Sequence, residues 1–238
     1  MASIKDNRGY RQGFVLDTST TVRMERRARL LMSEMNITRD TRILEMGCGT
    51  GEVSYWMASW SPAQVLGTDL CVPFIEGAKK KYQLTNLEYK VLDFNDPMTL
   101  PDGHFDYIVG NGIIHHLVKN LDDVLASMRR LLKEDGKIIF MEPNLYNPYI
   151  YFIFSYQTLR ALTHLEPDEM AFSKRFIIGV LARAGFTDIK VDYKDFLLPG
   201  IPNFLVKPSI FIGAMLEKLP LFKLVSQSIF IRASKSSQ

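Results

Sequence analysis

Three glycines at alternate positions, Gly47, Gly49 and Gly51, follow a short apolar segment that contains one acid, Glu45. Glycine lets the backbone turn sharply and approach a ligand closely, because no Cβ stands in the way. An apolar strand that leads through such a turn into a helix is typical of cofactor loops at the carboxyl edge of a parallel sheet. The chemistry predicted here is therefore the binding of a nucleotide-like cofactor.

The spacing of this loop differs from that of a dinucleotide-binding loop. Its glycines read G-x-G-x-G instead of G-x-G-x-x-G, and Glu45 stands two residues before the first of them. A carboxylate at that position would repel a pyrophosphate but would suit an ammonium group. S-adenosyl-L-methionine has an ammonium group and no phosphate, so the loop, which includes Cys48, predicts this cofactor and S-adenosyl-L-homocysteine as the product.

Two further acids follow predicted strands at the spacing that a nucleoside needs. Asp69, next to Leu70, lies about 20 residues after the first glycine, where an acid can accept from both ribose hydroxyls. Asp93 and Phe94 follow the next strand, where the carboxylate could accept from an adenine amine while the ring packs on the base. The structural alternatives are a helix N-cap for Asp69 and a surface turn for Asp93.

Two adjacent histidines, His115 and His116, follow the predicted strand at 105–110 together with Asn111. This strand end lies beside the glycine loop in a doubly wound sheet, so we expect Asn111 to contact the cofactor and one histidine to act on the acceptor. Successive residues of a helical turn point about 100° apart, so the two histidines are not both expected to face the cofactor. Glu142 ends the next strand and could orient an imidazole. The alternatives are that the histidines are core residues and that Glu142 makes a structural hydrogen bond. Nothing in the sequence requires a metal.

Segments of strand length alternate with segments of helical periodicity along most of the chain. This alternation predicts an α/β fold with a parallel sheet and helices on both faces, and residues 1–238 are expected to form a single domain. Two stretches depart from this alternation of strands and helices. The stretch at 143–172 is aromatic-rich and irregular, and the stretch at 196–224 is apolar and interrupted by prolines. We expect both stretches to cover the acceptor. Helices are predicted at 19–36, 51–58, 73–81, 122–132 and 173–184, and strands at 41–46, 63–69, 86–92, 105–110, 137–142, 188–193 and 225–233.

The composition is that of a globular protein, with 47% hydrophobic and 23% charged residues. Two cysteines can neither build a disulfide framework nor complete a zinc site, and no apolar leader begins the chain, so a cytoplasmic location is expected. Both ends of the chain are basic, which fits a solvated surface or a contact with an anionic substrate or a membrane surface. No pattern suggests nucleic acid binding, and none indicates the oligomeric state.

Residues 40–142 resemble the class I S-adenosylmethionine-dependent methyltransferases, specifically the group with the ubiquinone-biosynthesis and small-molecule natural-product enzymes. The resemblance implies a Rossmann-like, seven-stranded sheet with an antiparallel last strand, which residues 225–233 could supply. It also implies that the glycine loop holds the methionine part, Asp69 the ribose and Asp93-Phe94 the adenine, and it places His115 where a base is frequent. The turn LLKEDG departs from the usual Pro-Gly-Gly without affecting a catalytic position. The segments in family order are ILEMGCGTG, VLGTDL, VLDFND, FDYIVGNGIIHHL and LLKEDGKIIFMEP.

The sequence thus predicts methyl transfer to a small or lipid-linked acceptor, at oxygen, because an alcohol needs its proton removed and histidine titrates near the working pH. The alternatives are N- or C-methylation, a non-catalytic cofactor-binding module, and a dehydrogenase, against which the acid before the glycines argues. Three segments of the second half resemble methyltransferases of polysaccharide and lipid-linked glycan pathways. They are EPN-x-x-NP (142–148), PDE-x-AF (167–172) and DFL-x-P (195–199). Residues 143–159 and 196–215 are apolar, but polar residues and prolines interrupt them, so they are not expected to span a bilayer. They either pack as core or form an apolar mouth for the acceptor that makes a peripheral contact with a membrane.

Overall fold

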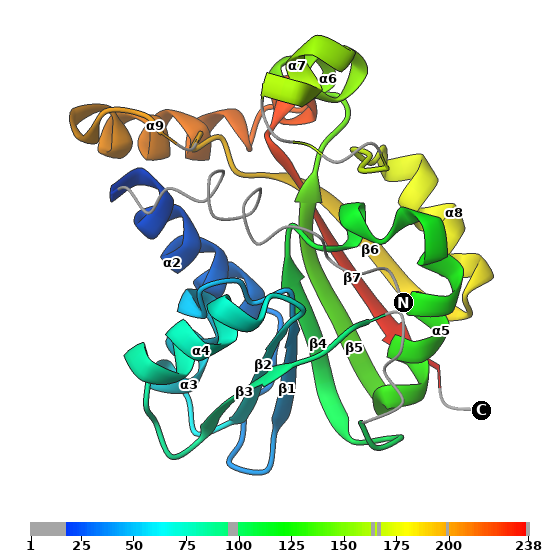
Figure 1. Ribbon diagram of the computed structural model, residues 1–238. Helices are drawn as coiled ribbons and strands as arrows, with labels where there is room; N and C mark the ends of the chain where they lie inside the picture. The colour runs from blue at the N-terminus through cyan, green and yellow to red at the C-terminus, as the bar shows by residue number, and fades with distance from the viewer. Residues whose placement is uncertain (1–17, 95–99, 163–164, 166–167, 199, 237–238) are drawn as a thin grey trace.

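One mixed sheet organises the chain in this computed structural model, which describes residues 18–94, 100–162, 165, 168–198 and 200–236. Its strand order is β3-β2-β1-β4-β5-β7-β6, and β7 runs antiparallel to both of its neighbours (Figure 1). The predicted Rossmann-like sheet of seven strands with an antiparallel last strand is therefore confirmed. The strands are β1 (Arg42–Met46), β2 (Gln64–Asp69), β3 (Leu87–Val91), β4 (Phe105–Asn111), β5 (Leu132–Pro143), β6 (Phe186–Lys194) and β7 (Ser228–Lys235).

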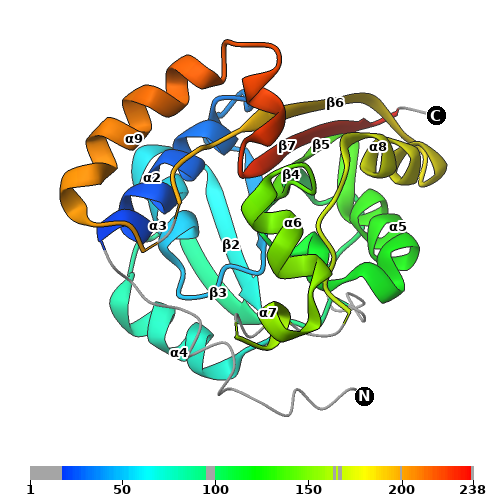
Figure 2. The same ribbon diagram turned by 90° about the horizontal axis from the view of Figure 1, so that it is seen from above.

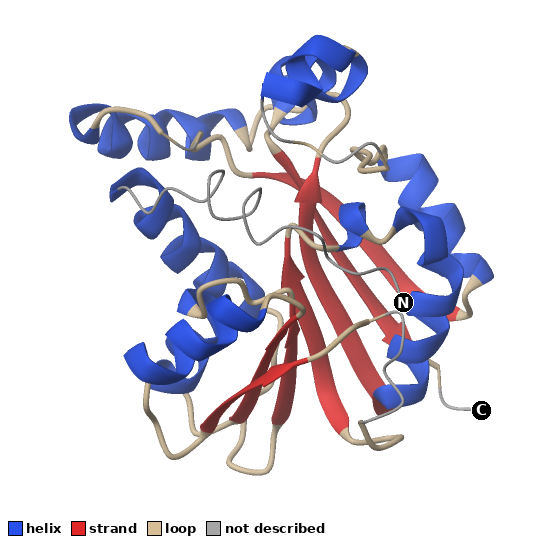
Figure 3. Cartoon of the chain, in the orientation of Figure 1, coloured by secondary structure: helices blue, strands red, loops and turns tan. Residues whose placement is uncertain are grey.

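Helices cover both faces of the sheet, as Figure 3 shows by colour. On one face, α3 (Glu52–Trp60) and α4 (Val72–Lys81) pack against β2 and β3, and α2 (Thr18–Met32) packs against α3 and β5. Leu31 and Met57 are fully buried there. On the other face, α5 (Leu121–Leu131) and α8 (Lys174–Arg183) enclose the larger core around Phe140 and Phe172. The apolar stripes of these helices thus hold the carboxyl ends of β1, β2, β4 and β5 at one edge.

Several boundaries differ from the sequence prediction for local reasons. The first helix ends at Met32 instead of continuing to residue 36, because Ser33 and Glu34 form a turn. In that turn the Glu34 N–H donates to the Leu31 carbonyl, three residues back instead of four. Strand β5 begins at Leu132, where the sequence suggested a helix end and a turn, because Leu132 pairs with Phe105 across a register shift. The register shift lets residues 132–136 join the strand although they include two acids and a glycine.

The stretch at 143–172, which was expected to be irregular, contains two helices, so this part of the prediction is wrong, and the apolar, proline-punctuated stretch at 196–224 contains a helix as well. Helix α6 (Pro148–Ser155) begins where the Asn147 side chain accepts from Ile150 N–H, and Pro148 suits its first turn. Helix α7 (Gln157–Leu162) follows it directly. Helix α9 (Asn203–Leu216) tolerates Pro208 inside it. The remaining elements are the 3-10 turns η2 (Ile114–His116), η3 (Val118–Asn120) and η4 (Phe222–Val225).

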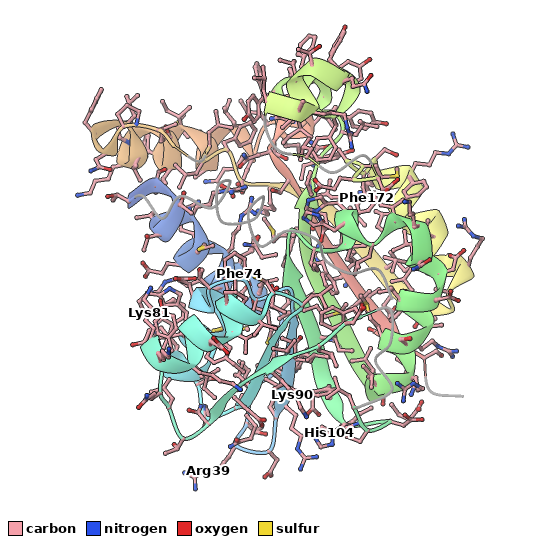
Figure 4. The ribbon with its side chains drawn as sticks, in the orientation of Figure 1. Arg39, Phe74, Lys81, Lys90, His104 and Phe172 are labelled. Atoms are coloured by element: carbon pink, nitrogen blue, oxygen red, sulfur yellow. The ribbon has the colours of Figure 1, made fainter. Side chains whose placement is uncertain are left out.

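Helices α6, α7 and α9 stand at the carboxyl edge of the parallel strands (Figure 2). Phe172, labelled in Figure 4, lies near the upper end of the strands and is fully buried. Its N–H donates to the Pro143 carbonyl at 3.0 Å, and its carbonyl accepts from Leu145 N–H at 3.0 Å. No helix among the described residues is long and apolar enough to cross a bilayer. Residues 1–17, and Pro167 and Pro199 of the PDE-x-AF and DFL-x-P segments, lie outside the described residues.

Candidate active site

The glycine loop after β1 turns through three left-handed positions. Gly47, Gly49 and Gly51 have φ values of 64°, 53° and 88°, which residues other than glycine rarely adopt. A Cβ at Gly47 would in addition lie 2.7 Å from the side chain of Ile113. The loop therefore requires glycine on two grounds, and its bare backbone can approach a ligand closely.

Asp69 joins this loop to the start of α4. Its Oδ2 atom accepts from Gly49 N–H at 2.9 Å, and its Oδ1 atom accepts from Cys71 N–H at 2.8 Å. Burial raises the pKa of Asp69, and the hydrogen bonds from the backbone oppose that rise. Cys48 is buried within the loop, and Leu70 is half-buried beside the carboxylate. The Asp69 carboxylate thus braces the loop.

Glu45 lies beneath the loop and is only 1% exposed. Its Oε2 atom accepts a hydrogen bond from Ser54 Oγ on α3. Burial raises the pKa of Glu45 to about 8, the bond from Ser54 opposes this, and the charges of Glu52 and Asp69 add to it. The carboxyl group is enclosed instead of standing on the open side of the loop, so its contact with an ammonium group stays a prediction.

The other predicted cofactor residues lie at the ends of β3 and β4. Asp93 is half-buried, whereas Phe94 is buried in the core cluster that contains Leu100. The Oδ1 atom of Asn111 accepts from Arg27 Nη1 at 2.7 Å, so α2 fixes the position of this amide. Their contacts with adenine and cofactor stay predictions.

His115 and Glu142 form a buried pair where β4 and β5 end. Glu142 Oε1 accepts from the N–H groups of Ile113 and Ile114 at 3.0 and 2.8 Å, and Glu142 Oε2 lies 2.8 Å from His115 Nδ1. Glu142 is fully buried. A carboxylate at Nδ1 favours the tautomer with its proton there, which leaves Nε2 as a proton acceptor. The pair is therefore arranged as an oriented base.

Glu169, which the sequence reasoning did not single out, contacts both histidines. Its Oε1 atom lies 3.0 Å from His116 Nδ1, and its Oε2 atom lies 3.9 Å from His115 Nε2. The imidazole centroids are only 4.1 Å apart, so the rings converge on one carboxylate although their Cβ directions diverge in the 3-10 turn. The available signal was an acid directly before the apolar residues 170–172.

These three side chains also form a set of possible metal ligands. His115, His116 and Glu169 each offer one ligand atom, and the atoms lie within 4.8 Å of one another. Two imidazoles and a carboxylate are ligands that Zn²⁺ accepts. The sequence alone required no metal, and the cluster becomes visible only once the segment after α7 is folded against η2.

Arg27 is a second feature that sequence reasoning missed. Its guanidinium donates to Asp195 Oδ2 at 2.9 Å, to Asn111 Oδ1 at 2.7 Å and to Ser228 Oγ at 2.6 Å. Burial alone would raise the pKa of Asp195, but Arg27 and Arg23 outweigh it and lower that pKa. Arg27 therefore ties α2 to the ends of β4, β6 and β7. Three arginines stand close together at 26–29, and the sequence does not show which one turns inward.

The chain is similar to known methyltransferases in sequence and in fold. A methyltransferase domain family matches residues 44–140. The ubiquinone/menaquinone biosynthesis C-methyltransferase UbiE of Desulfotalea psychrophila is 29% identical over 177 residues, which cover 66% of this chain and 69% of the relative. A demethylmenaquinone methyltransferase of Staphylococcus epidermidis is 29% identical over 190 residues, with coverages of 68% and 74%. The chain is a class I S-adenosylmethionine-dependent methyltransferase.

A solved structure extends the fold similarity over nearly the whole methyltransferase. A Haloferax volcanii methyltransferase, solved in complex with the activator Trm112, matches with a TM-score of 0.69 at 16% identity, covering 98% of this chain and 99% of that chain. At this identity the likeness concerns the fold alone.

S-adenosylmethionine is the cofactor of this methyltransferase, and the residues present fit it. The left-handed glycines leave room for close backbone approach, and the carboxyl groups of Glu45 and Asp69 lie beside the loop. When bound, the cofactor supplies an electrophilic methyl group. The chain then has to hold the acceptor in line with that methyl group.

Proposed function

We propose that this methyltransferase acts on a small or amphiphilic acceptor with a weakly acidic proton, and that His115 removes that proton. The observation that carries the proposal is the 2.8 Å contact between His115 Nδ1 and Glu142 Oε2. Glu142 is held by backbone N–H groups, so it can fix the ring and stabilise the imidazolium that forms. General-base catalysis of this kind contributes about 10²–10⁴ to the rate.

We favour carbon as the atom that receives the methyl group. The names of two relatives support this choice, because one is a C-methyltransferase of ubiquinone and menaquinone biosynthesis and the other acts on demethylmenaquinone. A hydroxylated ring or an enol that loses its proton carries nucleophilic charge on both carbon and oxygen. Oxygen, which the sequence reasoning favoured, is the second candidate because the same oriented imidazole would deprotonate a hydroxyl group.

His116 and Glu169 complete the proposed acceptor side. Glu169 bridges the two imidazoles, so it holds His116 in place and keeps a negative charge close to His115 Nε2. That charge would favour the imidazolium formed when His115 takes up a proton. In this proposal Glu142 orients the ring and Glu169 stabilises its charged form.

The test is single-turnover methylation of a panel of hydroxylated quinols and phenols with isotope-labelled S-adenosylmethionine. His115→Ala should lower turnover by about 10²–10⁴ with little change in cofactor affinity, and Glu142→Gln should lower it by a smaller factor. His104→Ala is the control, because His104 contacts Arg42 away from the site. Nuclear magnetic resonance of the product then distinguishes a C-methyl from an O-methyl group.

Two results would contradict this function. Parental turnover of His115→Ala across about pH 6–9 would mean that positioning alone carries the reaction. Cofactor binding without methylation of any acceptor of this class would point to an acceptor of different chemistry or to a non-catalytic module.

A further inference from the structure

The outward face of α9 is more apolar than its inward face. Five outward residues recur at i, i+4, i+7, i+8 and i+11, a spacing that places them on one side of a helix. The inward side buries only Val206 and Gly213. A surface helix of a globular protein shows the reverse arrangement. The outward residues are Phe204 (75% exposed), Pro208, Phe211 (69%), Ile212 (53%) and Met215 (55%).

Two neighbouring elements extend this apolar surface. The segment that contains η4 exposes Leu221 and Phe222, and helix α6 together with its C-cap residue exposes four aromatic side chains. All three elements lie at the carboxyl edge of the sheet (Figures 1 and 2). We call them together the docking face. Its aromatic members on α6 and at the C-cap of that helix are Tyr149, Tyr151, Phe152 and Tyr156. Globular proteins rarely leave apolar patches of this kind to water, and those they expose often mark interaction sites.

Hydrogen bonds join two parts of the docking face, α6 and the segment that contains η4. Asn144 Nδ2 donates to the carbonyls of Leu224 and Ser226 at 2.8 and 2.7 Å, and Asn147 Nδ2 donates to the Val225 carbonyl at 2.7 Å. Gly213 lets α9 pack closely against Phe196, because a Cβ at this position would lie only 2.9 Å from Phe196 Cβ. The two asparagines of the EPN-x-x-NP segment thus hold α6 against η4.

The charges on the docking face are of one sign. Glu217 turns inward, where its carboxylate accepts from Lys194 Nζ and from Asp195 N–H, both at 2.9 Å. Lys207 and Lys218 are exposed, and residues 148–162 contain no acid. An apolar surface whose outward charges are cationic complements a bilayer with anionic head groups.

We propose that the docking face binds the surface of an anionic lipid bilayer, with α9 lying in the interface. The proposal deepens the proposed function and rests on its amphiphilic acceptor, because docking would hold the carboxyl edge of the sheet against the membrane. Tyrosine prefers the boundary between lipid and water, which suits the side chains of α6. Lys207 and Lys218 would then face lipid phosphates.

The test is co-sedimentation of the full chain with vesicles of phosphatidylcholine alone and of phosphatidylcholine mixed with phosphatidylglycerol. We expect binding to the anionic vesicles at about 50 mM salt and weaker binding at about 500 mM. Phe204→Ser with Phe211→Ser should lower the partition coefficient more than tenfold, and Lys207→Glu about tenfold. Val91→Ser, which removes a 41% exposed apolar side chain from the edge strand β3, is the control and should bind like the parent.

Three results would overturn the proposal. The first is that the α9 variants bind vesicles like the parent, and the second is that the parent binds neutral and anionic vesicles equally. The third is that the parent does not bind vesicles but forms a concentration-dependent dimer, which the α9 variants do not form. The last result would identify a second copy as the occupant. Circular dichroism melting curves show whether each variant folds. Vesicle binding by His115→Ala separates this test from the proposed function, since that variant should dock normally even where methylation fails.

Discussion

The buried carboxyl group of Glu45 should make the stability of this methyltransferase depend on pH in a defined direction. The pKa of Glu45 rises from 4.5 to about 8, chiefly because of burial. The native state therefore keeps a proton between these pH values that the unfolded chain has lost. The contribution of this group is fully present below pH 4.5, falls as the pH rises, and is exhausted above about pH 8.

Glu45→Gln removes this dependence, because glutamine keeps an oxygen that can accept from Ser54 Oγ but cannot ionise. Each pH unit corresponds to about 1.36 kcal/mol, so the variant should gain up to about 5 kcal/mol over the parent at high pH. The gain should be small near pH 5. Asp69, whose pKa is also raised, contributes a similar slope to both proteins and cancels in the comparison.

The measurement is urea unfolding of parent and variant at about pH 5, 7 and 8.5, analysed by linear extrapolation. Glu88→Gln, at an exposed glutamate of β3, is the control and should show no pH-dependent gain. A gain that is equal at pH 5 and 8.5, or a loss at pH 8.5, would refute the reasoning. Positive charge of the cofactor near Glu45 should also release its proton, so calorimetry in buffers of different ionisation enthalpy should show fewer protons released by Glu45→Gln.

Other predictions follow from the loop, the arginine network and the histidine cluster. Gly49→Val should abolish cofactor binding in calorimetry, because its φ of 53° disfavours a branched side chain that would also block the loop; unchanged affinity would exclude the loop as the binding element. Arg27→Met should lower the free energy of unfolding by about 1–3 kcal/mol, since it removes one of the two cationic partners of the buried Asp195 carboxylate and leaves Arg23 as the other; an unchanged free energy of unfolding would contradict that role. Micromolar Zn²⁺ should inhibit the parent reversibly through the cluster of His115 and Glu169, whereas Glu169→Gln should lose that sensitivity; equal inhibition of both would place the metal elsewhere.

The cofactor half of the fold could be read from the sequence because its signals are local. The apolar run before Gly47 and the acids that end the predicted strands each define their own strand end, and parallel pairing brings those ends to one edge. Helices α6 and α9 escaped prediction because prolines suggested breaks. The structure places Pro148 in a first turn, where it costs no hydrogen bond, and the packing of Gly213 on Phe196 supports α9 around Pro208.

The missed site residues depend on partners that are distant in the chain. Glu169 meets the histidines only because residues 170–172 pair with the backbone around His115 and Pro143. Arg27 gains its role from Asp195 and Ser228, which lie 168 and 201 residues away. No local periodicity distinguishes it from the neighbouring arginines, so only the tertiary fold identifies it.

The bracing of Glu142 by the backbone at the start of η2 has a consequence for how this protein can diversify. The carboxylate takes its hydrogen bonds from Ile113, Ile114 and His115, all of which follow β4. The orientation of the imidazole at Nδ1 is thus set by Glu142 and the backbone after β4, and α6 adds an edge contact between the rings of Phe154 and His115, whose centroids lie 6.2 Å apart. Substitutions in α7, in α9 or in α6 outside Phe154 can therefore accumulate while the contact between His115 and Glu142 stays intact.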